Sequence, residues 1–218
     1  MTEKIALVTG ASRGLGSAIG EELALRGWHV VAVARTVGGL EDLDDRVKRA
    51  GLPGAGALTL APMDVTSDDA MRHLCRSIHD RWGGLRLWVH AAVHAAPLAP
   101  MGSLDQKDWE KSVATNTRAT GMLIPMVEPL LRAHRGTALF LDDPRAGQAF
   151  FGAYGATKAA QMALARSWQA ETARHGPRVV IATPAPMPTA TRARFFPGED
   201  KRVLAEVKAE AARILDNL

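Results

Sequence analysis

Tyr154 and Lys158 are the side chains of this sequence whose types and spacing most directly indicate acid–base chemistry. They stand four residues apart in the segment YGATK, and Tyr154 is the only tyrosine in the chain. On a helix this spacing places both side chains on one face. A neighbouring ammonium group stabilises a tyrosinate and lowers the phenol pKa from its usual value near ~10. The pair therefore predicts a group that exchanges a proton with an alcohol or carbonyl.

A glycine-rich segment near the N-terminus, TGASRGLG, indicates where a dinucleotide would bind. Gly10, Gly14 and Gly16 follow the apolar run 5–8 and precede a helical segment. Glycines allow tight turns with positive φ and let the backbone approach a pyrophosphate, while the following helix N-terminus offers free N–H groups. The strand before the glycines and the helix after them supply the context that a glycine triplet alone lacks.

The end of the second predicted strand favours NADP(H) over NAD. NAD-binding proteins of this architecture usually carry an acidic residue there, which accepts a hydrogen bond from the ribose 2′-OH. Here Ala34 is followed by Arg35. A missing carboxylate removes repulsion against a 2′-phosphate, and a guanidinium can pair with that phosphate. Arg13, in the glycine-rich segment, can reach the same group. The alternative is that Arg35 is a surface residue beyond the strand.

Short apolar runs alternate with helical segments along the chain, which predicts an α/β fold. Such runs are typical of buried parallel strands, and the helices between them then cover both faces of the sheet. We expect a Rossmann-like, doubly wound parallel sheet of about six strands. The expected strands are 5–8, 29–34, 57–61, 85–90, 137–141 and 178–183. The expected helices are 17–26, 40–49, 67–82, 105–112, 114–132, 154–175 and 201–217, and the proline-rich segment 184–197 is expected to be a loop.

The composition is that of one globular domain, predicted to span residues 1–218. Hydrophobic residues make up 47% and charged residues 23% of the chain, and no apolar run approaches the ~20 residues that cross a bilayer. Residues 1–4 lead directly into the first apolar run, so we expect no signal peptide. Cys75 is the only cysteine, which favours a reducing, cytoplasmic compartment. The net charge is +4, but the basic residues are scattered among acidic ones, which argues against a nucleic-acid partner.

The sequence resembles the short-chain dehydrogenase/reductase family over nearly its whole length. TGASRGLG resembles the family's cofactor loop, and YGATK resembles its Tyr-x-x-x-Lys signature. The resemblance implies that Asn116 completes a proton relay through a water and that Lys158 also holds the nicotinamide ribose.

The same resemblance implies a set of cofactor contacts. Asp64 and Val65 resemble the pair that holds the adenine, and Pro184 and Thr189 resemble a turn and a threonine near the nicotinamide. The complete set of expected NADP(H)-binding residues is Gly10, Ser12, Arg13, Gly14, Leu15, Gly16, Arg35, Asp64, Val65, Ala91, Lys158, Pro184 and Thr189.

One departure from the family concerns its catalytic serine at the end of the fifth strand. This sequence has no serine or threonine there, and Asp142 or Asp143 takes the position. An ionised carboxylate cannot donate to a carbonyl and would raise the pKa of Tyr154, whereas an aspartic acid in an apolar pocket can stay neutral and donate. The alternative is that both aspartates cap a loop or face solvent. The expected catalytic residues are Tyr154, Lys158, Asn116 and Asp143.

Two further departures concern the fourth strand and the end of the chain. The segment 90–93, HAAV, replaces the family's Asn-Asn-Ala-Gly, and Val93 either crowds the nicotinamide ribose or is absorbed by a small loop shift. His90 and His94 lack further ligands at suitable spacing, so we expect a structural or exposed pair and no metal site. We expect six strands without the family's seventh, and a homodimer or higher homo-oligomer that forms through the helix that contains Asn116.

The predicted function is an NADP(H)-dependent oxidoreductase that interconverts a carbonyl and an alcohol by hydride transfer on a small-molecule substrate. The alternative is an NADP(H)-binding protein with weak or no catalysis, a redox sensor or scaffold, which the missing serine motivates. The loop 185–200 is expected to cover the substrate. Phe195 and Phe196 in it suit an apolar ligand and Arg192 and Arg194 suit an anionic one, so the sequence leaves the substrate open.

Overall fold

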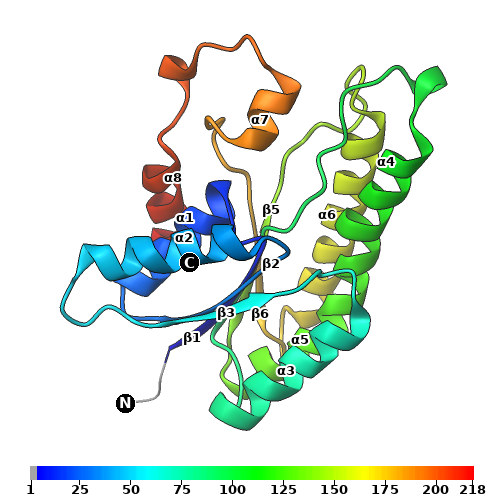
Figure 1. The fold of residues 1–218 in the computed structure, drawn as a ribbon. Helices are drawn as coiled ribbons and strands as arrows, with labels where there is room; N and C mark the ends of the chain where they lie inside the picture. Colours follow the sequence, from blue (N-terminus) through cyan, green and yellow to red (C-terminus); the bar gives the residue numbers. More distant parts are fainter. Residues whose placement is uncertain (1–3) are drawn as a thin grey trace.

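The computed structural model describes residues 4–218, which form a six-stranded parallel sheet with helices on both faces (Figure 1). Residues 1–3 lie outside the described part. The predicted domain, 1–218, and the expectation of no signal peptide both include these three residues. The strand order is β3-β2-β1-β4-β5-β6, and each neighbouring pair is parallel. The predicted Rossmann-like, doubly wound sheet is thereby confirmed. Strand order reverses between β1 and β4, and a crevice opens at the carboxyl ends of the strands at such a point.

The strands lie close to the ranges that the sequence predicts, and most helices do as well. The strands are β1 Ile5–Thr9, β2 His29–Ala34, β3 Leu58–Pro62, β4 Leu87–His90, β5 Thr137–Leu141 and β6 Arg178–Ala182. The helices are α1 Gly14–Leu25, α2 Val37–Ala50, α3 Asp68–Trp82, α4 Gln106–Ser112, α5 Ala119–Ala133, α6 Gly152–Thr172, α7 Ala190–Phe195 and α8 Val207–Asp216. None of these helices, within residues 4–218, combines the length and apolarity needed to cross a membrane.

The sheet is buried on both faces because successive side chains of each strand point to opposite sides. In β1, Ile5 and Leu7 pack with side chains of α3, α5 and α6, whereas Ala6 and Val8 pack with those of α1, α2 and α8. Figure 1 shows these two helical layers on the two faces of the sheet. A strand covered on both sides requires an unbroken apolar run, which explains why these runs are so clear in the sequence.

The two helices predicted at 105–112 and 114–132 are one continuous helix, which corrects the prediction of a break. A π-helical turn, Val113–Arg118, joins α4 to α5, and the residues at both junctions keep helical dihedrals. Pro125 and Pro129 lie inside α5 on its exposed side, where water can bind the carbonyl groups that lack an N–H partner. Asn116 lies in the π-helical turn, a feature often found at functional sites.

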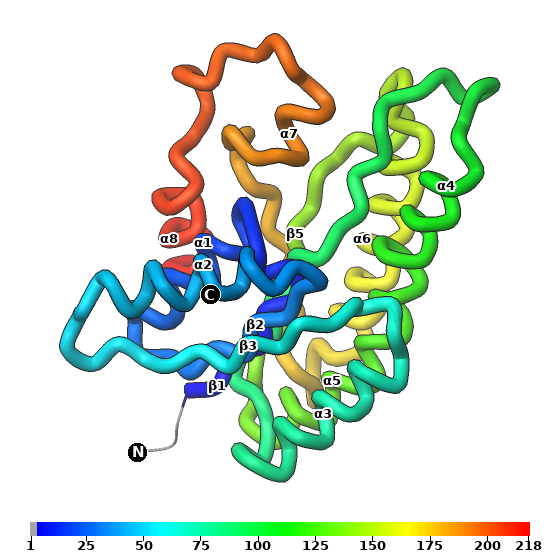
Figure 2. The backbone as a smooth tube through the Cα atoms, in the orientation of Figure 1, coloured from blue at the N-terminus to red at the C-terminus, as the bar shows by residue number. Residues whose placement is uncertain are grey.

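The segment after β6 also differs from the prediction. The expected loop 184–197 contains helix α7, and the expected helix 201–217 is a short 3₁₀ turn, Lys201–Val203, followed by α8. Figure 2 shows this segment rising from β6, crossing over the carboxyl ends of the strands and descending to α8 beside α1. Phe195 of α7 packs against Phe151 and Tyr154, so tertiary contacts hold this short helix above the sheet.

Candidate active site

The glycine-rich loop between β1 and α1 has no room for a side chain at Gly10 or at Gly16. Gly10 has φ +80°, and a Cβ there would lie 2.6 Å from the backbone N of Ala92. A Cβ on Gly16 would lie 2.4 Å from the carbonyl oxygen of Gly10. The loop therefore lies against the end of β4 and leaves the first N–H groups of α1 open to the crevice. Free N–H groups at the start of a twelve-residue helix, beside a glycine cradle, fit a pyrophosphate.

The side chains at the ends of β2 and β3 form the adenine side of the crevice. Arg35 follows β2 and is 60% exposed, and its Nη1 lies 3.9 Å from Oδ2 of Asp64. The other oxygen of Asp64, Oδ1, accepts hydrogen bonds of 2.9 Å from the backbone N and the Oγ1 of Thr66. These bonds fix the Asp64 carboxylate after β3, and Arg35 and the exposed Arg13 line the same cavity.

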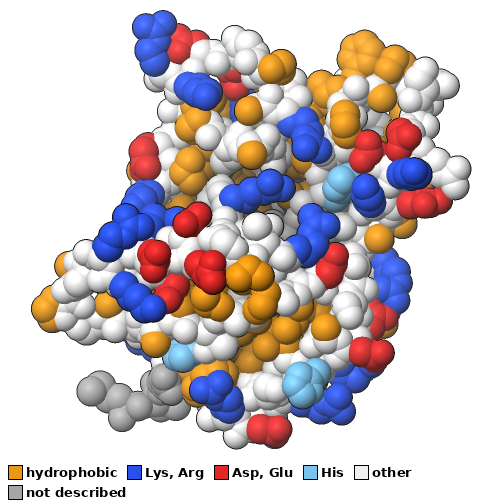
Figure 3. All heavy atoms as spheres, in the orientation of Figure 1, with side chains coloured by type: hydrophobic (Ala, Val, Ile, Leu, Met, Phe, Trp, Pro, Cys, Tyr) orange, Lys and Arg blue, Asp and Glu red, His pale blue; other side chains and the backbone are white. Residues whose placement is uncertain are grey.

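A single cavity of about 390 Å³ joins the glycine-rich loop to Tyr154 and Lys158. Figure 3 shows Lys and Arg side chains around a central recess on this face of the molecule. Val93, Arg145 and Arg192 also line the cavity. All of the expected site residues except Asn116 line it, namely Gly10, Ser12, Arg13, Gly14, Leu15, Gly16, Arg35, Asp64, Val65, Ala91, Asp143, Tyr154, Lys158, Pro184 and Thr189.

Tyr154, near the start of α6, is buried, and its hydroxyl group donates to Oδ2 of Asp143 at 3.0 Å. The other Asp143 oxygen, Oδ1, accepts from Nε of Arg145 at 2.9 Å. Burial raises the pKa of Tyr154, and the Asp143 carboxylate raises it further, while Arg145 opposes this shift. Of the two aspartates in the serine position, Asp143 is therefore the one in contact with the tyrosine. Asp142 instead faces Arg166, with 3.4 Å between Oδ2 and Nη2.

Lys158 lies one helical turn after Tyr154 and is buried. Its ammonium group donates to Oε1 of Gln161 at 2.5 Å. Burial lowers the pKa of Lys158 to about 8, and the carboxylates of Asp142 and Asp143 limit this shift. The i, i+3 spacing of Lys158 and Gln161 on one helix is the local signal that could have identified Gln161 from the sequence.

A buried chain of hydrogen bonds continues from Gln161 into the core. Nε2 of Gln161 donates to Oγ1 of Thr120 at 3.0 Å, and the Thr120 hydroxyl group donates to the carbonyl oxygen of Asn116 at 2.9 Å. Nε2 of His90 lies 2.9 Å from Oγ1 of Thr120, and its Nδ1 lies 2.8 Å from Oγ1 of Thr9. All of these bonds are satisfied together when His90 is neutral and carries its proton on Nε2. This series of hydrogen bonds thus links Lys158 to Thr9, the residue before Gly10.

Asn116 supports the site without lining its cavity. Its Oδ1 accepts from the backbone N of His94 at 2.7 Å, and its Nδ2 donates to the His94 carbonyl and to Oγ1 of Thr157, each at 2.9 Å. The side chain therefore ties the segment after β4 to α6, one residue before Lys158. The imidazole of His94 pairs with Asp108 at 3.2 Å between Nε2 and Oδ1, so the two histidines have separate environments.

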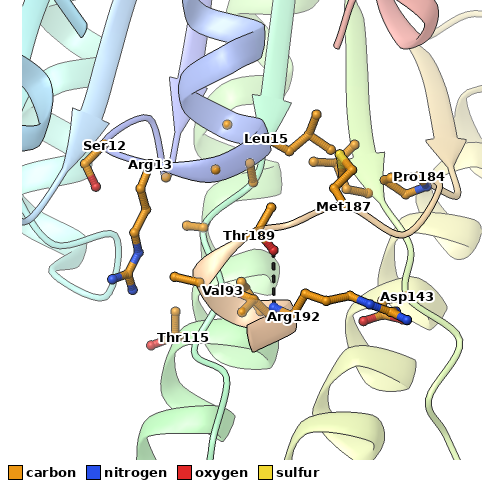
Figure 4. A pocket seen from close by; sticks show the side chains of 18 of the residues that line it. Ser12, Arg13, Leu15, Val93, Thr115, Asp143, Pro184, Met187, Thr189 and Arg192 are labelled. Atoms are coloured by element: carbon orange, nitrogen blue, oxygen red, sulfur yellow. Dashed lines mark hydrogen bonds between the residues drawn. The ribbon is translucent and has the colours of Figure 1, made fainter. Parts of the chain in front are cut away.

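Helix α7 and the start of α6 enclose the end of the cavity beyond Tyr154. The ring centroid of Phe195 lies 4.8 Å from that of Tyr154 and 5.0 Å from that of Phe151. Thr189 caps α7 by accepting from the backbone N of Arg192 at 3.2 Å, and its side chain faces Gly14. Figure 4 shows the Arg192 side chain extending from α7 toward Asp143. The guanidinium of Arg192 forms two hydrogen bonds with Glu199, at 2.6 and 2.5 Å.

His90 gives the fold a specific sensitivity to acid, which is our first prediction. Burial lowers the pKa of His90 to about 3, from 6.5 in an unfolded chain, so the unfolded chain binds more protons between these two values. The free energy of unfolding should therefore fall as the pH drops from 6.5 toward 3. The measurement is urea unfolding at about pH 7 and about pH 5. The His90→Asn variant should lose less stability over this interval than the exposed-site control His73→Asn, and equal losses would contradict the prediction.

Comparison with known proteins agrees with the fold. Residues 4–200 match the model of the short chain dehydrogenase family. A tropinone reductase homolog of Arabidopsis thaliana is 30% identical over 212 residues, which cover 96% of this chain and 77% of the relative. A glycine betaine reductase of Emericella nidulans is 27% identical over 187 residues, which are 84% of this chain but 14% of that much longer protein.

The fold of a solved structure from the same family is also similar to that of this chain. The short chain dehydrogenase of Shigella flexneri 2a, crystallised with NADP, superimposes with a TM-score of 0.84 at 25% identity. The matched region covers 95% of this chain and 87% of the other. The match to the family model extends from the residue before β1 to the segment after α7, so it includes the glycine-rich loop, Tyr154 and Lys158. This chain therefore belongs to the short-chain dehydrogenase family.

Proposed function

We propose that this protein is an NADP(H)-dependent oxidoreductase that reduces a polarised double bond of a small molecule, in the simplest case a carbonyl group to an alcohol. The observation that carries the proposal is the single cavity that joins the glycine-rich loop, Arg35, Tyr154 and Lys158. A cofactor seated on that loop and extended along the crevice would reach the tyrosine, because all of these residues share one continuous wall.

The residues on the adenine side support NADP(H) as the cofactor. Arg13 and Arg35 both line the cavity, and no carboxylate follows β2 where an NAD-binding protein would carry one. Thr66 fixes the Asp64 carboxylate beside Arg35 on the cavity wall, where the adenosine would lie. The related dehydrogenase of Shigella flexneri was crystallised with NADP, which agrees with this choice.

The surroundings of Tyr154 favour reduction over oxidation. The cofactor supplies a hydride when bound, and Tyr154 then donates its proton to the atom that gains negative charge. Because burial and Asp143 raise the pKa of Tyr154, the tyrosine carries its proton before the hydride moves, which is the state that reduction requires. Lys158 contributes a positive charge from within the same wall of the cavity, and Gln161 fixes its position.

The test of this proposal is consumption of NADPH in the presence of a panel of small ketones, aldehydes and imines, followed by the absorbance of the reduced nicotinamide. We expect NADPH-dependent turnover that exceeds turnover with NADH. Absence of turnover with every compound of the panel, together with tight NADPH binding, would favour the second candidate function.

The second candidate is an NADP(H)-binding protein that acts as a redox sensor or scaffold with little catalysis. Two observations favour it: the Tyr154 hydroxyl is bonded to Asp143 rather than open to a substrate, and Val93 lines the cavity where the family has glycine. The two candidates differ in turnover and agree in NADPH binding, so the assay above separates them.

The pH dependence of turnover is our second prediction. Lys158 has a pKa lowered to about 8, and it carries its charge only below that value. Tyr154 has a raised pKa and stays protonated over this range. The reductive kcat/KM should therefore fall as the pH rises through about 8. The Gln161→Glu variant places a carboxylate against Lys158 and should move this fall to higher pH, whereas the exposed control Gln106→Glu should leave it in place. An unmoved profile in Gln161→Glu would contradict the assignment to Lys158.

A further inference from the structure

We infer that the double bond reduced in this site is a carbon–nitrogen bond, presented as a protonated cyclic iminium, in preference to a carbonyl group. The inference rests on the proposed function, because it uses the same cofactor, the same cavity and Tyr154. It adds the class of substrate, which follows from the hydrogen bonds and charges that face the tyrosine hydroxyl.

The hydrogen-bonding capacity of Asp143 is the first reason. Its carboxylate accepts from the Tyr154 hydroxyl at 3.0 Å and from Nε of Arg145 at 2.9 Å. A carboxylate is an acceptor only, and a carbonyl oxygen is an acceptor only, so the two cannot bond to one another. The alkoxide that forms during carbonyl reduction would also be repelled by the neighbouring carboxylate. An iminium N–H is a donor, and it can replace the tyrosine hydroxyl as the partner of Asp143 Oδ2.

The balance of charge around Tyr154 is the second reason. The charged groups that act on its hydroxyl are the carboxylates of Asp143 and Asp142, which raise the pKa of Tyr154, and the guanidinium of Arg145, which lowers it. Of these groups, Asp143 is the one that the hydroxyl contacts, so a cation that takes the place of the hydroxyl would lie against a carboxylate.

The other cations near Asp143 are already paired. The guanidinium of Arg192 forms two hydrogen bonds with Glu199, and the ammonium of Lys158 donates to Gln161. Asp143 itself pairs with Arg145 through Oδ1, and its Oδ2, which accepts from Tyr154, is the oxygen that a substrate cation would approach.

The aromatic lining of the cavity is the third reason. Phe195 and Phe196 line it, and Phe151 packs against both rings at centroid distances of 5.0 and 6.1 Å. Aromatic faces attract organic cations more strongly than neutral ligands of the same shape. The guanidinium groups of Arg145 and Arg192 already lie over the Phe196 ring, at 5.3 and 4.4 Å from its centroid. Phe195, whose ring centroid lies 4.8 Å from that of Tyr154, is therefore the ring that an apolar substrate with a positive nitrogen would contact.

The step balances without any further reactant. NADPH supplies the hydride to the iminium carbon, the π electron pair of the C=N bond moves to nitrogen, and the products are a neutral amine and NADP⁺. When the imine arrives neutral, Tyr154 supplies the proton to nitrogen and regains one from solvent. The Asp143 carboxylate holds the N–H and keeps the nitrogen positive until the hydride arrives.

The test compares dihydroisoquinoline, a cyclic imine, with tetralone, a bicyclic ketone of similar size. We expect kcat/KM for the imine to exceed that for the ketone by about tenfold or more, the range of one hydrogen bond to a charged group. In Asp143→Ser, which restores a donor, this preference should fall by at least about tenfold, while the remote surface control Asp80→Ser should keep it. A wild-type preference for tetralone, or an unchanged preference in Asp143→Ser, would overturn the inference.

A binding measurement gives a readout that does not depend on turnover. The protonated amine tetrahydroisoquinoline should bind the protein without cofactor, and Asp143→Asn, which keeps the shape and loses the charge, should weaken this binding about tenfold. Equal binding to both proteins would overturn the inference, even if neither acceptor is reduced. Failure of NADPH to bind would instead contradict the proposed function, so the two failures are distinguishable.

Discussion

Replacing Tyr154 with phenylalanine should lower NADPH-dependent turnover by about a hundredfold to ten-thousandfold, the range associated with loss of a positioned acid. The hydroxyl is buried beside Asp143, and among the described residues it is the one phenol group on the cavity wall, so no neighbouring side chain offers the same proton. The measurement is the steady-state rate with saturating NADPH and a carbonyl acceptor, which arrives without the proton that it must gain.

The same variant keeps the ring that packs against Phe195 and Phe151, so the fold should be retained. Affinity for NADPH and the thermal midpoint therefore serve as controls, and both should change little. Turnover that persists unaltered in Tyr154→Phe, with binding intact, would mean that another group delivers the proton and would remove the basis of the proposed mechanism.

Replacing Arg35 with aspartate should weaken NADPH binding by about tenfold to hundredfold, which corresponds to loss of one or two charge-assisted hydrogen bonds. The new carboxylate would repel a 2′-phosphate and accept from a ribose 2′-OH, so the affinity for NADH should fall less or rise. The measurement is the ratio of the two dissociation constants, obtained from the fluorescence of the bound reduced nicotinamide.

The matched control for Arg35→Asp is Arg49→Asp, an exposed arginine at the end of α2 that does not line the cavity. Both variants change the net charge equally, so a general loss of attraction for the anionic cofactor would appear in both. An unchanged NADPH-to-NADH ratio in Arg35→Asp would assign the 2′-phosphate to another group, and Arg13 would be the next residue to replace.

The sheet and the glycine-rich loop could be predicted from the sequence because local rules determine them. A strand buried on both faces must be apolar throughout, and β1 and β2 are. The loop requires glycine at position 10 because of its positive φ and at position 16 because the Gly10 carbonyl lies against it. The apolar residues of the strands and the glycines of the loop can therefore be read directly from the sequence.

Helix α7 could not be predicted because its stability comes from distant residues. It has six residues in a proline-rich segment, too few for an isolated helix to form. Its formation depends on the cap at Thr189 and on the packing of Phe195 against Tyr154, a residue of another helix. The continuity of α4 and α5 was missed for a related reason, since a π-helical turn shifts the periodicity of buried residues within the helix.

The hydrogen bonds among the buried polar residues of the site also could not be predicted from local sequence patterns. Gln161, Thr120 and His90 belong to three different elements, and only the tertiary arrangement joins them into one chain of hydrogen bonds. The sequence placed two aspartates where the family has serine, and geometry was needed to show that Asp143 contacts Tyr154. Arg145 was missed, although its position two residues after Asp143 was a local signal.

The central claim is that this chain binds NADP(H) across the crevice that leads to Tyr154, and calorimetric titration of the unmodified protein with NADPH and with NADH tests it most directly. The account predicts saturable binding of both, with the dissociation constant for NADPH lower by about tenfold or more because Arg13 and Arg35 meet the 2′-phosphate. The Gly16→Val variant, whose side chain would collide with the Gly10 carbonyl, should lose this binding. Absence of heat with either dinucleotide, from protein that is folded by circular dichroism, would contradict the account.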